Sequence, residues 1–230
     1  MRIAATNQTG SSRTQNTRSI AIKKISIKGS NCPDINIRSL PQRNFLHRHT
    51  VDRHMVETAV VAATLTRRVH RPDLLLIAAL FHDIGKGGQE DHSHRGAALI
   101  EPLAKRIGFN DEDTATLRVL VEHHLLLPAT ATRRDLNDPV TIATVIEKIP
   151  DLQTLELLHV LSIADGEATG SGAWSEWKAT LVADLVRRVA AAMTGTMIAP
   201  QPELTAEQRA LSELGALRAE VSISESDYSY

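Results

Sequence analysis

An apolar segment that ends in an adjacent histidine and aspartate is the feature that most constrains this chain. Residues 74–81 are entirely apolar and predict a buried helix, and His82 and Asp83 follow directly, shortly before Gly85. Imidazole and carboxylate groups are common ligands of catalytic divalent metals, so the pair is a reasonable start for a hydrolytic metal site. A two-residue match is frequent by chance, and the hypothesis therefore depends on partners elsewhere in the chain.

The composition favours a helical protein. Hydrophobic residues make up 42% of the 230 residues, but aromatic residues only 3%. Leu, Ile, Val and Ala must therefore fill the core, which suits helices better than a β-sandwich. The length fits one compact domain with tails, or two small domains.

Charge and cysteine content exclude several classes of protein. The net charge of -1 provides no basic field for nucleic-acid binding. The single cysteine, Cys32, excludes an internal disulfide and fits a reducing cytoplasm. No apolar run approaches the roughly 18 residues of a membrane span, and the N-terminus lacks the apolar part of a secretory signal. We expect a cytoplasmic protein with no membrane or nucleic-acid partner, and its oligomeric state stays unknown.

Hydrophobic periodicity and capping residues predict an all-α bundle, with no central strand between residues 43 and 195. Trp174 and Trp177 are expected to face inward. A short last helix is expected near Thr205, and residues 20–28 could form an edge strand. The main helices are predicted over Thr50 to the break at Pro72, Pro72 to Gly85, Ser93 to Ile107, Asn110 to near Pro128, Asp138 to Pro150, Asp151 to Asp165, and Trp174 to Met193.

The predicted domain occupies the middle of the chain. Residues 1–40 are basic and polar and are expected to form a disordered or irregular tail. Residues 41–195 are expected to form the domain itself. Residues 196–230 are expected to be a linker, a short helix and a tail.

Histidines cluster in one third of the sequence, where five features on different predicted helices could build a metal site. Nine of the ten histidines lie between His47 and His124. Helical bundles bring ligands from several helices into the core in this way. Asp165 follows an apolar run and needs a partner, since an unpaired buried charge is costly. The five features are His54, His82-Asp83, His92, His123-His124 and Asp165.

Each candidate also has a structural interpretation. His54 alone could be an interfacial histidine rather than a ligand. His123 and His124 point about 100° apart on a helix, so at most one is a direct ligand. His94 competes with His92 for the same role. Other polar residues are interpreted as capping charges (Asp111, Asp113) or as histidines without a function (His47, His49, His70).

The ordered pattern of His54, His82-Asp83 and Asp165 resembles the HD-domain metal-dependent phosphohydrolases. The closer resemblance is to the HD domain of the bifunctional uridylyltransferase/uridylyl-removing enzymes of bacterial nitrogen control. It covers about residues 41–190. The matching stretches are residues 41–44, 50–54, 81–86, 91–93, 122–126, 133–139, 164–170 and 173–178.

The resemblance implies an HD-type bundle that binds one or two divalent ions. His54, His82, Asp83 and Asp165 would bind one ion, with His92 and His124 as ligands of a second and Asp83 as a bridge. Mn²⁺, Mg²⁺ and Fe²⁺ suit such ligands. Enzymes of this kind remove a nucleotidyl group from a tyrosine of the PII signal protein. The residues assigned to catalysis are Asp83, Lys86 and Arg134, and those assigned to phosphodiester binding are Lys86, Arg133 and Arg134.

The chain departs from that family in what surrounds the domain. Residues 1–40 are too few for a nucleotidyltransferase domain, and residues 195–230 are too few for an ACT domain. We therefore expect no transferase activity and no glutamine sensing. Whether the group removed is UMP or AMP stays open. The alternatives are a phosphohydrolase of small nucleotides and a non-catalytic module that binds a partner.

Overall fold

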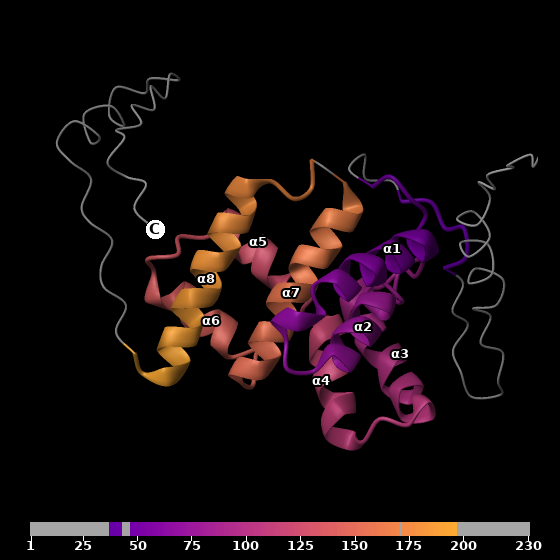
Figure 1. The fold of residues 1–230 in the computed structure, drawn as a ribbon, viewed down its shortest axis with the longest axis horizontal. Helices are drawn as coiled ribbons and strands as arrows, with labels where there is room; N and C mark the ends of the chain where they lie inside the picture. Colours follow the sequence, from indigo (N-terminus) through magenta and orange to yellow (C-terminus); the bar gives the residue numbers. More distant parts are fainter. Residues whose placement is uncertain (1–36, 43–46, 171, 197–230) are drawn as a thin grey trace, which may run out of the picture. The chain divides into compact units, whose positions relative to one another are not determined.

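The computed structural model describes residues 37–42, 47–170 and 172–196 and shows only helices and connecting turns in them, which confirms the all-α prediction (Figure 1). None of these helices has the length and apolar character needed to cross a bilayer. The helices are α1 (Val51–Thr64), the 3₁₀-helix η1 (Thr66–Arg68), α2 (Pro72–Phe81), α3 (His92–Ile107), α4 (Asp111–Glu122), α5 (Leu126–Arg133), α6 (Pro139–Ile146), α7 (Leu152–Thr169) and α8 (Glu176–Thr194).

Side-chain caps define where several of these helices begin. The carboxylate or amide oxygens of Asn110, Asp138 and Asp151 accept hydrogen bonds from backbone N–H groups of the first turn, as their positions in the sequence predict. Thr50 precedes α1 in an extended conformation but makes no such side-chain bond. Gly108 ends α3 with a φ of 110°, a conformation that glycine adopts at little cost.

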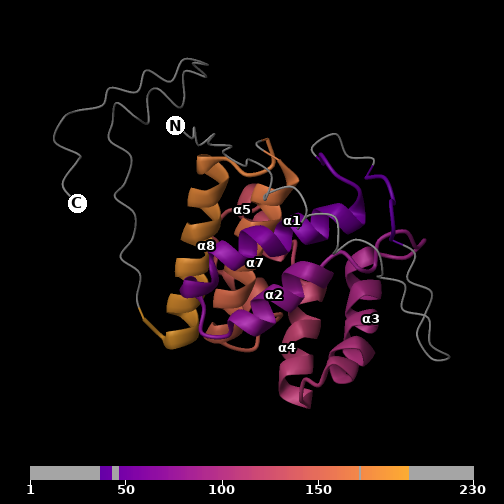
Figure 2. The ribbon, with the colours of Figure 1, turned by 45° about the vertical axis from the view of Figure 1, so that its right-hand side comes forward.

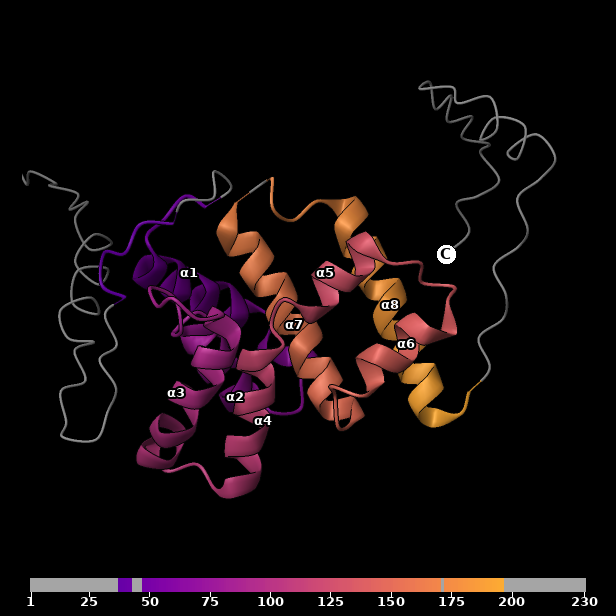
Figure 3. The ribbon, with the colours of Figure 1, turned by 180° about the vertical axis from the view of Figure 1, so that it is seen from behind.

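Helix α7 is the centre of the bundle. It packs against α1 and α2 on one side and against α5 and α8 on the other (Figures 1 and 3). Helices α3 and α4 form a hairpin, and α4 joins it to α2 and α7 (Figure 2). Buried side chains lie around most of α7, from Leu155 to Ala164. Such an all-round apolar helix needs neighbours on every side, which explains its central position.

Two predicted helix ends near the histidines were wrong. Helix α2 ends at Phe81, and residues 82–87 form turns instead of continuing the helix to Gly85. Helix α4 ends at Glu122, so His123 and His124 lie in a turn rather than on a helix. A separate helix, α5, then contains Pro128. Proline fits the first turn of a helix, where its missing N–H costs nothing, and here it does not end one.

The C-terminal part of the described chain also differs from expectation. Helix α7 continues past Asp165 to Thr169, and α8 begins only after Trp174. Trp174 packs against the core, but Trp177 is 64% exposed. At 3.6 residues per turn Trp177 lies about 140° around the helix from the buried Val182. The predicted strand in residues 20–28, the helix near Thr205 and the tails apart from residues 37–40 and 196 lie outside the described residues.

Candidate metal centre

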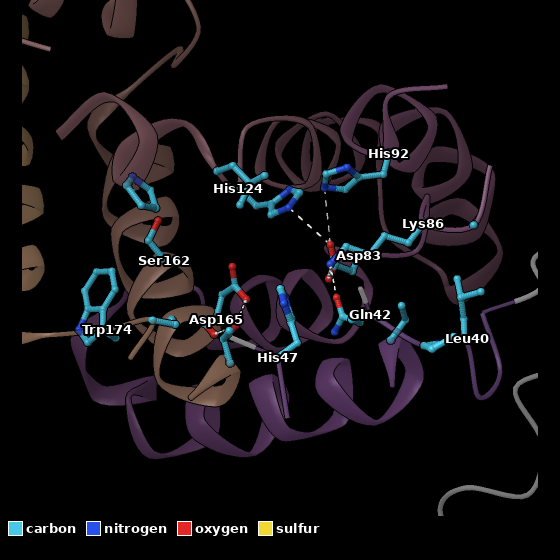
Figure 4. A pocket seen from close by; sticks show the side chains of 18 of the residues that line it. Leu40, Gln42, His47, Asp83, Lys86, His92, His124, Ser162, Asp165 and Trp174 are labelled. Atoms are coloured by element: carbon cyan, nitrogen blue, oxygen red, sulfur yellow. Dashed lines mark hydrogen bonds and ion pairs between the residues drawn. The ribbon is translucent and has the colours of Figure 1, made fainter. Parts of the chain in front are cut away.

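The six predicted metal ligands come together as two adjoining groups of three. Figure 4 shows Asp83, His92, His124 and Asp165 around the cavity that they line. Within each group the ligand atoms lie within 4.8 Å of one another. Helices α1 and α7 and the turns and helix ends that follow α2 and α4 supply most of them. The first group is His54, His82 and Asp165, and the second is Asp83, His92 and His124.

The first group brings two buried histidines and a partly buried aspartate close together. Nε2 of His54 lies 3.2 Å from Nε2 of His82 and 2.9 Å from Oδ1 of Asp165. The same Asp165 oxygen lies 3.5 Å from Nε2 of His82. Two ring nitrogens and a carboxylate oxygen thus converge on one point, which is the arrangement that binds a divalent cation.

Asp83 belongs to the second group and also adjoins the first. Its Oδ2 is 3.4 Å from Nε2 of His82 and 3.8 Å from Nε2 of His54. Its Oδ1 is 3.6 Å from Nε2 of His124 and 3.8 Å from Nε2 of His92. Each carboxylate oxygen therefore faces a different group of ligands.

The backbone fixes which nitrogen two of the histidines present. Nδ1 of His82 donates to the carbonyl oxygen of Ala79 at 2.9 Å, and Nδ1 of His124 donates to that of Val121 at 2.7 Å. Nε2 of each ring is then left to act as a ligand. Nε2 of His92 is buried and has no hydrogen-bond partner. The donor set of imidazoles and carboxylates, together with this orphaned nitrogen, fits a divalent metal.

Burial and charge act against each other in this centre. Burial raises the pKa of the Asp83 and Asp165 carboxyls, but the neighbouring His82 imidazole outweighs it and holds both pKa values well below their usual range. Burial alone would lower the pKa of His82, yet the two carboxylates raise it to about 10. Burial, aided by His82, lowers the pKa of His124 to about 4. Both carboxylates are therefore ionised and His124 is neutral, as metal ligands must be.

Two glycines let the ligand-bearing segments approach. A Cβ on Gly85 would lie 2.0 Å from the carbonyl oxygen of His92, so only glycine lets the turn after Asp83 pack on the start of α3. A Cβ on Gly166 would lie 2.4 Å from Cε3 of Trp174. The tryptophan ring therefore lies directly against α7, next to Asp165.

A cavity of about 770 Å³ opens above the two groups. Lys86 lies in its wall, with Nζ 2.6 Å from Oδ2 of Asp83 and 2.6 Å from Oε1 of Gln42. Arg133 and Arg134 are exposed and do not line the cavity. The lining is part apolar (Leu40, Pro41, Val51, Leu125, Pro128, Ala173, Trp174) and part polar (Gln42, His47, Asp83, Lys86, His92, His124, Ser162, Asp165, Thr169, Lys178).

Three further side chains line the cavity that have no predicted role: Gln42, His47 and Lys178. The His47 ring lies edge-to-face on that of His54, with 5.5 Å between centroids and 81° between planes. Burial, together with the charge of Lys86, lowers the pKa of His47 and keeps it neutral. The position of His47 at the start of the histidine-rich third of the chain was the only feature of the sequence that pointed to a place in the site.

Comparison with known proteins gives consistent matches. The family model described as HD domain matches residues 51–169. The bifunctional uridylyltransferase/uridylyl-removing enzyme of Streptomyces coelicolor is 57% identical over 160 residues, which are 67% of this chain and 19% of that protein.

Proteins with the same name match from other organisms. That of Mycobacterium tuberculosis is 59% identical over 150 residues, or 65% of this chain and 18% of that protein. That of Gluconobacter oxydans is 41% identical over 141 residues, or 61% of this chain and 15% of that protein. The chain therefore spans less than a fifth of the length of these relatives.

Proposed function

The chain belongs to the HD domain family, and from this premise we propose that it is a metal-dependent phosphodiesterase that removes a nucleotidyl group, UMP or AMP, from a tyrosine of the PII signal protein. The observation that carries the proposal is the position of Asp83, which belongs to one group of candidate ligands and adjoins the other. The names of the relatives support the uridylyl-removing reaction. PII as the substrate, and with it a cytoplasmic location, follows from the sequence resemblance.

A divalent ion, when bound, supplies Lewis acidity to the phosphoryl oxygens and lowers the pKa of a water molecule. The protein's own part is to place and orient the groups around it. Asp83 directs one carboxylate oxygen toward each ligand group and would therefore be available to an ion held by either group. The carbonyl oxygens of Ala79 and Val121 keep the rings of His82 and His124 in orientation.

Lys86 is the cation best placed to meet a phosphodiester. Its ammonium group lies at the cavity wall beside Asp83, held also by Gln42. From there it can donate to a phosphoryl oxygen and offset its negative charge. Arg133 and Arg134 lie outside the cavity lining. We retain them as candidates for contacts with a protein substrate beyond the cavity.

The cavity favours a nucleotide-sized group. Its volume of about 770 Å³ falls within the usual range of small-molecule sites, roughly 300–1,000 Å³. Leu40 and Trp174 lie on opposite sides of the cavity (Figure 4) and offer apolar surfaces to the base and the tyrosine ring. The same size suits a free nucleotide, so a phosphohydrolase of small nucleotides is the second candidate.

A direct comparison of substrates tests the proposal. The purified chain, loaded with Mn²⁺, is given uridylylated PII, adenylylated PII and a set of free nucleotides in parallel, and mononucleotide or phosphate release is measured. We expect release from modified PII at a higher kcat/KM than from any free nucleotide. Preference for a free nucleotide would select the second candidate. Failure on every substrate, with metal bound, would leave the chain as a binding module.

A further inference from the structure

Among the described residues that line the cavity, His47 is the histidine that belongs to neither ligand group. It precedes α1 and lies edge-to-face on the ligand His54. Figure 4 shows its ring directed into the cavity between Asp165 and Asp83. An imidazole in this position would lie next to a substrate bound in the cavity over the first group of ligands.

The hydrogen bonding of His47 differs from that of the buried ligands. Nδ1 of His82 and of His124 each donates to a backbone carbonyl, which commits Nε2 to a metal. Nδ1 of His47 is buried and has no hydrogen-bond partner. No carbonyl therefore holds the proton at Nδ1, and the ring can carry it on Nε2, at the end that reaches into the cavity.

The charges around His47 favour an anion with acceptor oxygens. Lys86 stands on the opposite side of Asp83 and offers a cation. Bound metal ions would offset the two carboxylates beneath. A phosphoryl group beside Asp83 then has several acceptor oxygens, of which Lys86 can satisfy only part. A neutral N–H donor in the cavity wall can donate to one of the remaining phosphoryl oxygens, and its own desolvation costs little.

We propose that His47 contacts the substrate directly, donating a hydrogen bond from Nε2–H to a non-bridging oxygen of the phosphoryl group. The inference rests on the proposed function for the identity of that group. His47 would then be a substrate contact in addition to the metal ligands and Lys86. The phosphoryl group is thereby held from two sides, by Lys86 and by His47.

Three substitutions separate the hydrogen bond from the packing of the ring. His47→Phe keeps an aromatic edge against His54 but removes both nitrogens. His47→Gln places an amide N–H near the position of Nε2, whereas His47→Asn places it near Nδ1. Each variant is loaded with Mn²⁺ and its metal content measured. The affinity for inorganic phosphate is then determined by calorimetry, and kcat/KM with bis(p-nitrophenyl) phosphate.

We expect His47→Phe to weaken phosphate binding and to lower kcat/KM, each about tenfold or more, with metal content unchanged. His47→Gln should recover most of this loss and His47→Asn should not, a comparison that stands even if the Phe variant does not fold. Wild-type phosphate affinity in His47→Phe, equal behaviour of the Gln and Asn variants, or metal loss from all three would overturn the inference. A third result is also possible: the His47 variants bind phosphate more weakly than the wild type, but the wild type hydrolyses no diester. That result would refute the proposed function and leave the inference about His47 standing.

Discussion

Nζ of Lys86 lies 2.6 Å from Oδ2 of Asp83, the oxygen that also faces His82. The two residues are three positions apart in the turns that follow α2, so the same backbone turn places a metal ligand and a cation at one edge of the cavity. Lys86 is only partly buried, and Gln42 is its second partner. Its ammonium group therefore has room to reach a phosphoryl group while remaining close to Asp83.

Removing the Lys86 charge should lower catalysis without removing metal. We expect Lys86→Gln to reduce kcat/KM for a phosphodiester by about 10- to 100-fold, since a hydrogen bond to a charged group contributes about 1.5–3 kcal/mol. The measurement pairs steady-state kinetics with metal analysis, and the exposed Lys148→Gln is the control. Unchanged kcat/KM in Lys86→Gln would remove the lysine from the site.

Substitution of Asp83 should reduce metal binding at both ligand groups, and substitution of Asp165 at only one. We expect Asp83→Asn to lose metal from both groups and more than about 100-fold in kcat, because even outer partners of metal ligands are worth 10- to 100-fold. Asp165→Asn should lose metal chiefly from the group of His54 and His82. Metal stoichiometry by elemental analysis distinguishes the two. Asp151→Asn is the control, because asparagine caps a helix as well as aspartate does. Equal stoichiometry in all three variants would contradict the bridging position.

Gly85→Ala should damage the second ligand group through the backbone. The added Cβ would lie 2.0 Å from the His92 carbonyl and 2.5 Å from the Gly96 nitrogen, and neither can move without shifting α3. We expect the free energy of unfolding to fall by at least about 1–3 kcal/mol, the usual cost of overpacking, as measured by urea denaturation. Gly88→Ala is the matched control, since its Cβ would meet only the flexible Arg95 side chain. Equal stability of the two variants would show that the turn can relax.

Metal affinity should rise with pH because a proton must leave His82. The carboxylates raise the pKa of His82 to about 10 before metal binds, so the ring is protonated at neutral pH. Metal and proton compete for it, and the apparent affinity for Mn²⁺ should increase roughly tenfold per pH unit between pH 6 and 8. Calorimetry in buffers of different ionisation enthalpy should show close to one proton released per metal bound at the first group. A pH-independent affinity with no proton release would show that His82 is neutral beforehand.

The gathering of these side chains was predictable because their residue types and order carry the signal. His54, His82-Asp83 and Asp165 are separated by apolar helices, and helices of a bundle bring such residues together in the core. Where a helix ended was less predictable. Pro128 was interpreted as a terminator, although it lies in the first turn of α5. His124 nonetheless lies beside Asp83 and His92 although it belongs to a turn, and its role as a ligand stays a prediction.

The cavity wall could not be predicted from the sequence. Gln42 and His47 precede α1, where no periodicity shows which way a side chain points, and only packing brings them to the site. The inward orientation predicted for Trp177 was also wrong. A large apolar residue in the first turn of α8 matches an inward stripe in the sequence, but Trp177 lies about 140° around the helix from the buried Val182 and is exposed.

The most direct test of a metal-dependent phosphodiesterase is a metal titration of the chelated protein. UMP release from uridylylated PII is followed while Mn²⁺ is added in known equivalents, with bound metal measured in the same samples. The two groups bridged by Asp83 predict no release before addition and a rate that rises until about two ions are bound per chain. Release that persists after complete chelation, or full metal loading without release of any nucleotide, would contradict the account.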